Sequence, residues 1–337
     1  MKREPRRPAS LRDVAREAGV HASTVSRVLN HAELSGVGNE TRERVEQAAV
    51  RLRYRPNAQA RGLKMSATGA LGYLLPSLRN TANSPIVWGA LERAWERGHV
   101  VLIAEDSGSI AAHEAYERLV EERRIDGLLI NSARLGDPFF DHVASAHVPC
   151  VFVDRGHSRP GRNVVMREHD AGRLAVEHFL ELGHEQIAHL TGPRLTDTVL
   201  RRREGFEQGA AAAGLEPVVI EAELDEQEGR DAFERLAREH PQVTAIYIAN
   251  IHQAVGFVGA AHRHGVAIPA GLSVLSHDDD PVLEYGAIPI SAIRMPLAAL
   301  GATAVDALLG QIAGEAPRDI LLAQAPRLVD RGSTGRR

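Results

Sequence analysis

The residues near the N-terminus whose types and spacing best indicate a chemical role lie on a short segment, residues 22–29. Val25, Val28 and Leu29 repeat at helical spacing, so they would form the buried face of a helix. The opposite face carries short or hydrogen-bonding side chains: Ala22, Ser23, Ser26 and Arg27. An arginine there can donate two hydrogen bonds to guanine O6 and N7, worth about 1–3 kcal/mol of discrimination. The segment is therefore typical of a recognition helix that enters the DNA major groove.

The residues before and after this segment supply the rest of a helix-turn-helix. Ser10 and Asp13 form a capping box that predicts a helix starting at Leu11, and Gly19 can end it because glycine adopts positive φ readily. A third amphipathic helix follows, with an apolar face made by Thr41, Val45, Ala48 and Leu52. We expect three residues to hold phosphates: Ser10, Thr24 and Asn30. A three-helix unit without a DNA role would have the same core, but not the features described next.

Residues 55–64, RPNAQARGLK, predict a second DNA-contacting segment. Pro56 suits a first helical turn, yet so short a helix is marginal alone and Gly62 weakens it further. We therefore expect it to fold when it docks on DNA and on its symmetry mate. Leu63, its one large apolar residue, could wedge between base steps in the minor groove. The expected contacts from this hinge are Asn57, Ala60 and Leu63.

Charge is divided unevenly along the 337 residues. Residues 1–66 contain 14 Lys and Arg against 7 Asp and Glu, whereas the whole chain has a net charge of −4. A small basic head on a larger acidic body suits a protein whose head alone binds a polyanion. There is one cysteine, Cys150, which fits a reducing cytosol, and the basic N-terminus leads into no apolar signal core. We expect a cytoplasmic protein that binds no membrane.

The sequence resembles the LacI/GalR family of regulators along essentially the whole chain. The resemblance rests on LRDVAREAGVHASTVSRVLN, ETRERV and YRPNAQARGL in the head, and on VEHFLELGHEQIAHLTGP, RRREGF and LVDRGST in the body. It implies that Ala22, Ser23 and Arg27 read bases and that Leu63 is the minor-groove wedge. Two positions depart from the family: His21 replaces a capping serine, and Gly38-Asn39 replaces Ser-Glu before the third helix. Each costs up to about 1 kcal/mol of capping.

The body alternates apolar strand-like runs with helical stretches. Strands are predicted at 70–75, 99–104, 127–130, 150–153, 187–190, 244–248 and 272–275, and helices near 85–97, 112–123, 171–182, 200–213, 229–239, 253–264 and 298–312. Such alternation predicts α/β halves with parallel, doubly wound sheets. We expect the chain to cross between the halves near 155–165 and 290. The predicted domains are the head (1–54), the hinge (55–67) and a two-lobed effector-binding and dimerisation domain (68–337).

Polar residues at strand ends predict a ligand site, because open α/β sheets bind ligands there. The candidates are Asp154, Thr198, Arg202, Asn250 and Asp278. The family resemblance implies a periplasmic-binding-protein-like architecture and places all five at effector-contacting positions between two lobes. For any single one of them, a surface or ion-paired role is about as probable as ligand binding. A sugar, a sugar phosphate or another polar metabolite would suit the set.

The pocket floor departs from the family pattern. Asn250-Ile251 stands where relatives read Asn-Asp, and Ser276-His277 stands where they read Gly and an aromatic. Effector chemistry therefore does not carry over from relatives. Trp88 and Trp95 lie on a helical pattern that favours packing over sugar stacking.

Two apparent metal motifs are set aside. Successive residues 277–280 (HDDD) would point to opposite faces of an extended segment, and His184 and His189 lie five residues apart rather than the four that a zinc-protease helix needs. We therefore expect no metal, no other cofactor and no catalysis.

The prediction is a regulator, most often a repressor, that binds a palindromic operator as a homodimer or higher oligomer. A small effector would control its affinity. The alternative is a solute-binding protein or sugar-processing enzyme with a fused DNA-binding head. The lack of a signal peptide disfavours the first of these, and the lack of a nucleophile with a base disfavours the second.

Overall fold

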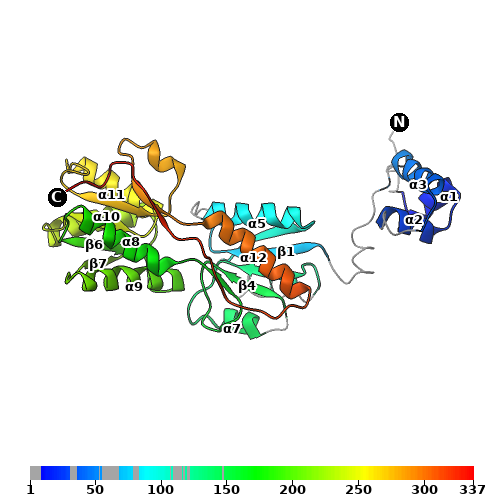
Figure 1. Ribbon diagram of the computed structural model, residues 1–337, viewed down its shortest axis with the longest axis horizontal. Helices are drawn as coiled ribbons and strands as arrows, with labels where there is room; N and C mark the ends of the chain where they lie inside the picture. The colour runs from blue at the N-terminus through cyan, green and yellow to red at the C-terminus, as the bar shows by residue number, and fades with distance from the viewer. Residues whose placement is uncertain are drawn as a thin grey trace. The chain divides into compact units, whose positions relative to one another are not determined.

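The computed structural model describes residues 9–30, 36–52, 54, 68–78, 83–106, 108, 116, 118–119, 122–145 and 148–337. The chain divides into two compact units, Met1–Thr68 and Gly69–Arg337 (Figure 1). The hinge predicted at 55–67, with Asn57, Ala60 and Leu63, lies outside the described residues, as does most of the helix predicted near 112–123. Within the described part of the chain, no helix is both long and apolar enough to cross a membrane.

The first unit contains the three predicted helices: α1 (Leu11–Ala18), α2 (Ala22–Asn30) and α3 (Asn39–Arg51). The capping box is confirmed, since the Ser10 side chain accepts from the Asp13 N–H and the Asp13 carboxylate accepts from the Ser10 N–H. Gly19 ends α1 at φ 65°. A small core joins the three helices: Val14, Ala15, Ala18, Val25, Val28, Val45, Ala48 and Ala49.

The two helix starts that depart from the family pattern, at His21 and at Gly38, are capped differently. The ring Nδ1 of His21 lies 3.3 Å from the Ser23 backbone nitrogen and 2.8 Å from the Ser23 hydroxyl. Histidine therefore takes over part of the role of the missing serine, because a ring nitrogen can accept an orphan N–H of the first turn. Gly38, in contrast, makes no side-chain cap for α3.

The second unit has two lobes, each built on a six-stranded sheet (Figure 1). The first sheet is parallel throughout, in the order β11-β5-β4-β3-β1-β2. Its strands are β1 (Ala70–Leu75), β2 (Val100–Glu105), β3 (Gly127–Ile130), β4 (Cys150–Val153), β5 (Asn163–Val165) and β11 (Ile320–Leu321). Its helices include α5 (Ser84–Glu96), α7 (Pro138–Ser145) and α12 (Leu297–Ile312).

The second sheet has the order β12-β10-β9-β8-β6-β7, with only the edge strand β12 antiparallel. Its strands are β6 (Ile187–Thr191), β7 (Val218–Glu221), β8 (Ala245–Ile248), β9 (Ser273–His277), β10 (Ser291–Arg294) and β12 (Arg327–Val329). Its helices are α8 (Glu168–Glu181), α9 (Asp197–Ala212), α10 (Glu226–Glu239) and α11 (Ile251–Arg263), with the 3-10 turn η2 (Pro281–Glu284). The predicted fold class, a helical head with a two-lobed α/β core, is confirmed.

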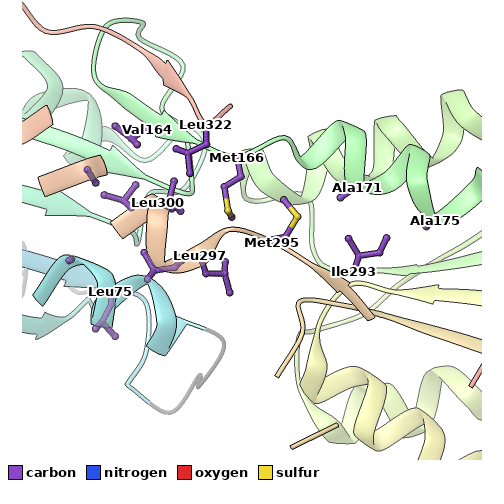
Figure 2. Close-up of a cluster of buried hydrophobic side chains, with 14 of the residues drawn as sticks. Leu75, Val164, Met166, Ala171, Ala175, Ile293, Met295, Leu297, Leu300 and Leu322 are labelled. Carbon is purple, nitrogen blue, oxygen red and sulfur yellow. The ribbon is translucent and has the colours of Figure 1, made fainter. Parts of the chain in front are cut away.

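The chain crosses between the lobes later than predicted, and once more often. β5 still pairs with β4 in the first sheet, so the first crossing follows Val165 rather than falling at 155–165. The second follows Arg294 rather than 290, because β10 belongs to the second sheet. A third, near 322–326, was not predicted, since β11 and β12 are too short to show a pattern. Figure 2 shows Met166 and Met295 side by side where two of these connections meet, inside a buried cluster that continues into both lobes.

Three helix pairs cross so closely that only glycine fits at the contact. A Cβ on Gly89 would lie 2.0 Å from the Ala298 carbonyl, one on Gly205 would lie 2.0 Å from the His169 carbonyl, and one on Gly256 would lie 1.9 Å from the Glu226 carbonyl. These contacts join α5 to α12, α8 to α9 and α10 to α11. Because the obstacle is backbone, an added methyl group could be accommodated only by moving whole helices apart.

Alanine substitution on α11 is therefore expected to have opposite effects three residues apart. Gly256→Ala should destabilise the protein by about 1–3 kcal/mol or more, because it overpacks the α10–α11 contact. Gly259→Ala, whose Cβ would meet only the tip of Arg263, should stabilise by up to about 1 kcal/mol through helix propensity. Urea denaturation of both variants measures the difference, and equal effects would contradict a close crossing at Gly256.

The two tryptophans of α5 do not pack inside this chain, contrary to the packing role favoured above. Trp88 is 64% exposed and Trp95 is 79% exposed. Helical periodicity identified their helix correctly but could not say which side faces the sheet.

Candidate functional site

All five residues predicted to bind an effector line one cavity of about 60 Å³ in the cleft between the lobes. Asp154 follows β4 of the first lobe, whereas Thr198 and Arg202 lie on α9, Asn250 precedes α11, and Asp278 follows β9, all in the second lobe. The cleft is completed by residues from both lobes: Asn83, Ile86, Arg155, Met166, Glu168, Thr196, Val199, Leu224, Ala249 and Leu297. Carboxyl ends of strands from two sheets thus meet at one place, as expected for this topology.

Two of the cleft residues are held in a conformation that side chains seldom adopt. Asp154 has φ 68° and Asp278 has φ 57°, both in the left-handed region. Such backbone costs of order 1 kcal/mol or more for a residue other than glycine, and it persists where surrounding structure enforces it. Both strained residues immediately follow a buried strand and both line the cavity, so the strain coincides with the site.

Arg202 is the cation in the middle of the cleft, and Glu168 is paired with it. The Arg202 Nε and Nη2 atoms each lie 2.9 Å from the same Glu168 carboxylate oxygen, and Nη1 donates to the Ala249 carbonyl at 2.8 Å. Glu168 is only 1% exposed, and Arg202 is 8% exposed. Glu168 was missed from the sequence. It begins a helix directly after a short unpredicted strand, β5, and recognising that strand would have marked it.

His277 lies between this ion pair and Tyr247 of the neighbouring strand β8. Its Nδ1 lies 2.6 Å from the Tyr247 hydroxyl, and its Nε2 lies 3.4 Å from Glu168 and 3.5 Å from Asp278. Burial raises the pKa of Tyr247 and lowers the pKa of His277, so a protonated phenol donates to a neutral imidazole. That assignment leaves the Nε2–H facing the two carboxyl groups.

Burial and mutual repulsion hold two cleft carboxyl groups partly protonated. Burial, and then the charge of Glu168, raise the pKa of Asp154 to about 6. Burial is also the main cause that raises the pKa of Asp278 to about 8, although Arg202 opposes it. The cleft therefore disfavours additional negative charge.

Asp278→Asn is expected to remove a pH-dependent loss of stability. Between pH 4 and 8 the folded chain keeps a proton on Asp278 that the unfolded chain releases, so rising pH favours unfolding. The variant should be more stable at pH 8, by roughly 1 kcal/mol or more, because asparagine carries no charge and tolerates the left-handed backbone. Denaturation midpoints from pH 5 to 8 test this. An unchanged slope would refute the protonation, and Asp306→Asn, in a surface ion pair with Arg97, is the control.

Asn250 and Thr198 serve the scaffold as well as the cleft. The Asn250 carbonyl oxygen caps α11 by accepting from the Gln253 N–H at 2.8 Å, and its amide donates to the Leu224 carbonyl at 3.0 Å. The Thr198 hydroxyl lies 3.2 Å from that of Thr196. Both residues also line the cavity.

The head exposes part of the predicted DNA-reading surface. Ser23 and Arg27 are exposed on α2, whereas Ala22, Thr24 and Ser26 are half-buried. The Ser10 hydroxyl is 2.6 Å from the Asp13 carboxylate, so its first role is the cap of α1. The side chain of Asn30 lies outside the described residues.

The residues of the apparent metal motifs have separate partners. Asp279 pairs with Arg294 and Arg331, and Asp280 caps η2. His184 lies within 3.0 Å of the Thr244 and Ser273 hydroxyl groups. His189 stacks on Tyr247 with ring centroids 5.0 Å apart.

Comparison with known proteins gives matches over both units. The pattern described as bacterial regulatory proteins of the lacI family matches residues 10–57, and a periplasmic binding protein-like domain matches residues 176–334. The HTH-type transcriptional repressor PurR of Photobacterium profundum is 28% identical over 96% of this chain and 98% of its own.

Solved structures also match nearly the whole chain. A Lac repressor bound to ONPG in a repressed state is 32% identical, with a TM-score of 0.86 over 97% of this chain and all of the other. The regulator CelR in complex with cellobiose is 26% identical, with a TM-score of 0.74 over 96% of this chain and 99% of the other. With a helix-turn-helix at one end and a two-lobed ligand cleft in the other unit, the chain belongs to the LacI family of bacterial regulatory proteins and is a DNA-binding transcriptional regulator, not an enzyme.

Proposed function

We propose that this protein represses transcription as a homodimer on a palindromic operator, and that a small polar effector bound in the cleft controls its affinity for DNA. The observation that carries the proposal is the presence, in one chain, of a helix α2 that exposes Ser23 and Arg27 and of a cleft where five polar residues from two lobes converge. Relatives over nearly the whole length are named repressors, and one Lac repressor was solved as a dimer on its operator.

An uncovered apolar surface supports the dimer. β2 is an edge strand of the first sheet, yet it exposes Val100, Leu102 and Ile103. Trp88, Leu91 and Trp95 of the adjacent α5 are exposed as well. We call these six residues the α5–β2 face. A bare apolar edge strand is an aggregation hazard unless a partner covers it, so we infer that a second copy of the chain does.

Closure of the two lobes would link effector to operator. The cavity is lined from both lobes, so a ligand that contacts both favours one relative arrangement of them. In the proposed dimer that arrangement sets the spacing of the two heads, and hence their fit to two half-sites. ONPG and cellobiose, bound by the two solved relatives, are both hydroxyl-rich, which supports a hydroxyl-bearing effector here.

Selection from random DNA at fixed salt tests the proposal directly. The full-length protein should enrich a sequence with two-fold symmetry, and the purified effector should change its dissociation constant for that sequence. Recovery of no symmetric site, or affinity equal to that for random DNA, would remove the proposed function.

Leu63→Ala tests the proposed hinge. Loss of an apolar wedge should lower affinity for the selected operator, because the DNA kink loses its support. The dependence of log affinity on log salt should hardly change, since no charge is removed. Arg61→Ala, the charged neighbour, is the comparison and should reduce the salt slope by up to about one unit. A full unit of slope change in Leu63→Ala would contradict a wedge role.

A further inference from the structure

We propose that the cleft accepts an effector rich in hydroxyl or amine donors and rejects one that carries a phosphate or carboxylate, and that Glu168 is the residue that excludes anions. This inference rests on the proposed function and names the chemistry of its effector.

The first argument is that the charge of Arg202 is already neutralised. Two of its nitrogens bind one oxygen of Glu168 at 2.9 Å, and a third binds the Ala249 carbonyl. An unpaired buried arginine would be the natural anchor for phosphate or carboxylate, because its planar fork matches them. Here the fork is occupied by the protein's own carboxylate. What Arg202 retains for a ligand is single N–H groups, which suit the oxygen of a hydroxyl group.

The second argument is that carboxyl groups outnumber guanidinium groups in the cleft. Three carboxyl groups line it, Asp154, Glu168 and Asp278, against two guanidinium groups, Arg155 and Arg202. The Oδ1 atom of Asp278 is buried and makes no hydrogen bond among the described residues, and the His277 Nε2 atom lies 3.5 Å from it. A buried polar atom without a hydrogen bond is costly, so a ligand that brings a hydroxyl group, which can donate and accept, is favoured there.

The third argument concerns an added negative charge. The cleft raises the pKa of Asp278 to about 8, through burial first and the neighbouring carboxylates Glu168 and Asp154 as well. Burial lowers the pKa of Arg155, the other cation of the cleft, and the nearby charge of Asp154 opposes that shift. A site that disfavours ionisation of its own carboxyl group would disfavour a second anion for the same reason.

Matched ligand sets on the full-length protein without DNA test the selectivity. Each set contains a neutral sugar, its 2-amino analogue, its 6-phosphate and its uronic acid, for glucose, galactose and mannose, with disaccharides and polyols as further neutral members. Thermal shift, followed by calorimetry for every hit, should find binding only among neutral and amino members. The phosphate of any bound sugar should bind on the order of 10- to 100-fold more weakly than its parent. Proton release on binding would identify an amine, and its absence would identify a neutral ligand.

Glu168→Gln tests whether Glu168 excludes anions from the cleft. This variant keeps the shape of the side chain but frees the charge of Arg202, so inorganic phosphate or sulfate should stabilise it saturably, beyond a sodium chloride control of equal ionic strength. Wild-type protein and Glu168→Asp should show no such effect. Glu177→Gln, an exposed position on the same helix, is the matched control. Circular dichroism establishes that each variant is folded, and if Glu168→Gln fails to fold, the wild-type ligand sets decide alone.

The outcomes separate this inference from the proposed function. Tighter binding of any phosphate or acid than of its neutral parent, or no binding by any neutral or amino member, overturns the inference while operator binding stands. Equal anion response of wild type and Glu168→Gln overturns the role of Glu168. If the protein selects no operator but still binds neutral or amino sugars, the proposed repressor function is wrong and the proposed class of ligand stands.

Discussion

Replacing Arg202 by methionine is expected to lower the free energy of unfolding of the effector unit by about 3–5 kcal/mol. The reason is burial: Glu168 is 1% exposed, so the variant leaves a buried carboxylate that has lost its ion pair with Arg202. Glu168→Gln should cost less, because Arg202 keeps its hydrogen bond to the Ala249 carbonyl and lines the cavity. Guanidinium denaturation followed by tryptophan fluorescence measures both, since both tryptophans lie in this unit.

The double variant sharpens this prediction. Arg202→Met combined with Glu168→Gln removes both charges and should be more stable than Arg202→Met alone, which is a positive coupling in a double-mutant cycle. Arg173→Met, in a surface ion pair with Glu177 on α8, is the control and should change stability by less than about 1 kcal/mol. If Arg202→Met were as mild as the control, the ion pair between Arg202 and Glu168 would not be a major contribution to stability.

Leu102→Glu is expected to dissociate the proposed dimer and, as a result, to weaken operator binding by roughly two orders of magnitude or more. Leu102 is 47% exposed at the centre of the edge strand β2 on the α5–β2 face. Two copies of a charged residue brought together in an apolar interface would be buried without partners. Each head would then bind a half-site without the effective concentration that its dimer mate supplies. Analytical ultracentrifugation and operator titration measure the two effects.

The opposite edge of the same sheet provides the control for this variant. Leu321 on β11 is 54% exposed, comparable to Leu102, but lies five strands away. Leu321→Glu should remain dimeric and bind the operator normally. A monomeric Leu321→Glu, or a dimeric Leu102→Glu, would place the interface elsewhere.

Local sequence signals predicted the head in detail. The Ser10–Asp13 box, Gly19 and the spacing of Val25 and Val28 predicted where α1 begins, where it ends and which side of α2 is buried. These features depend on residues within one helical turn, so the chain itself contains the information. Seven strands of the body were also predicted, because buried parallel strands appear as continuous apolar runs. The four-residue strands β7 and β10 and the shorter β5, β11 and β12 were not predicted.

The candidate cleft was predicted only in part. Asp154 and Asp278 could be named because strand ends in open α/β sheets share one edge. Glu168 and Tyr247 could not, since each is separated from its partner by some thirty residues: Glu168 meets Arg202 across the α8–α9 crossing, and Tyr247 meets His277 between neighbouring strands.

The sequence alone therefore determined the class of protein, the helix-turn-helix, the alternation of strands and helices and the strand-end residues of the cleft, because each is encoded in spacing along the chain. Only the tertiary structure decided that Arg202 is paired with Glu168, that Asp154 and Asp278 are strained and partly protonated, and that Trp88 and Trp95 face outward. Those properties arise from burial and from the distances between segments, and neither can be obtained from the order of residues without the fold.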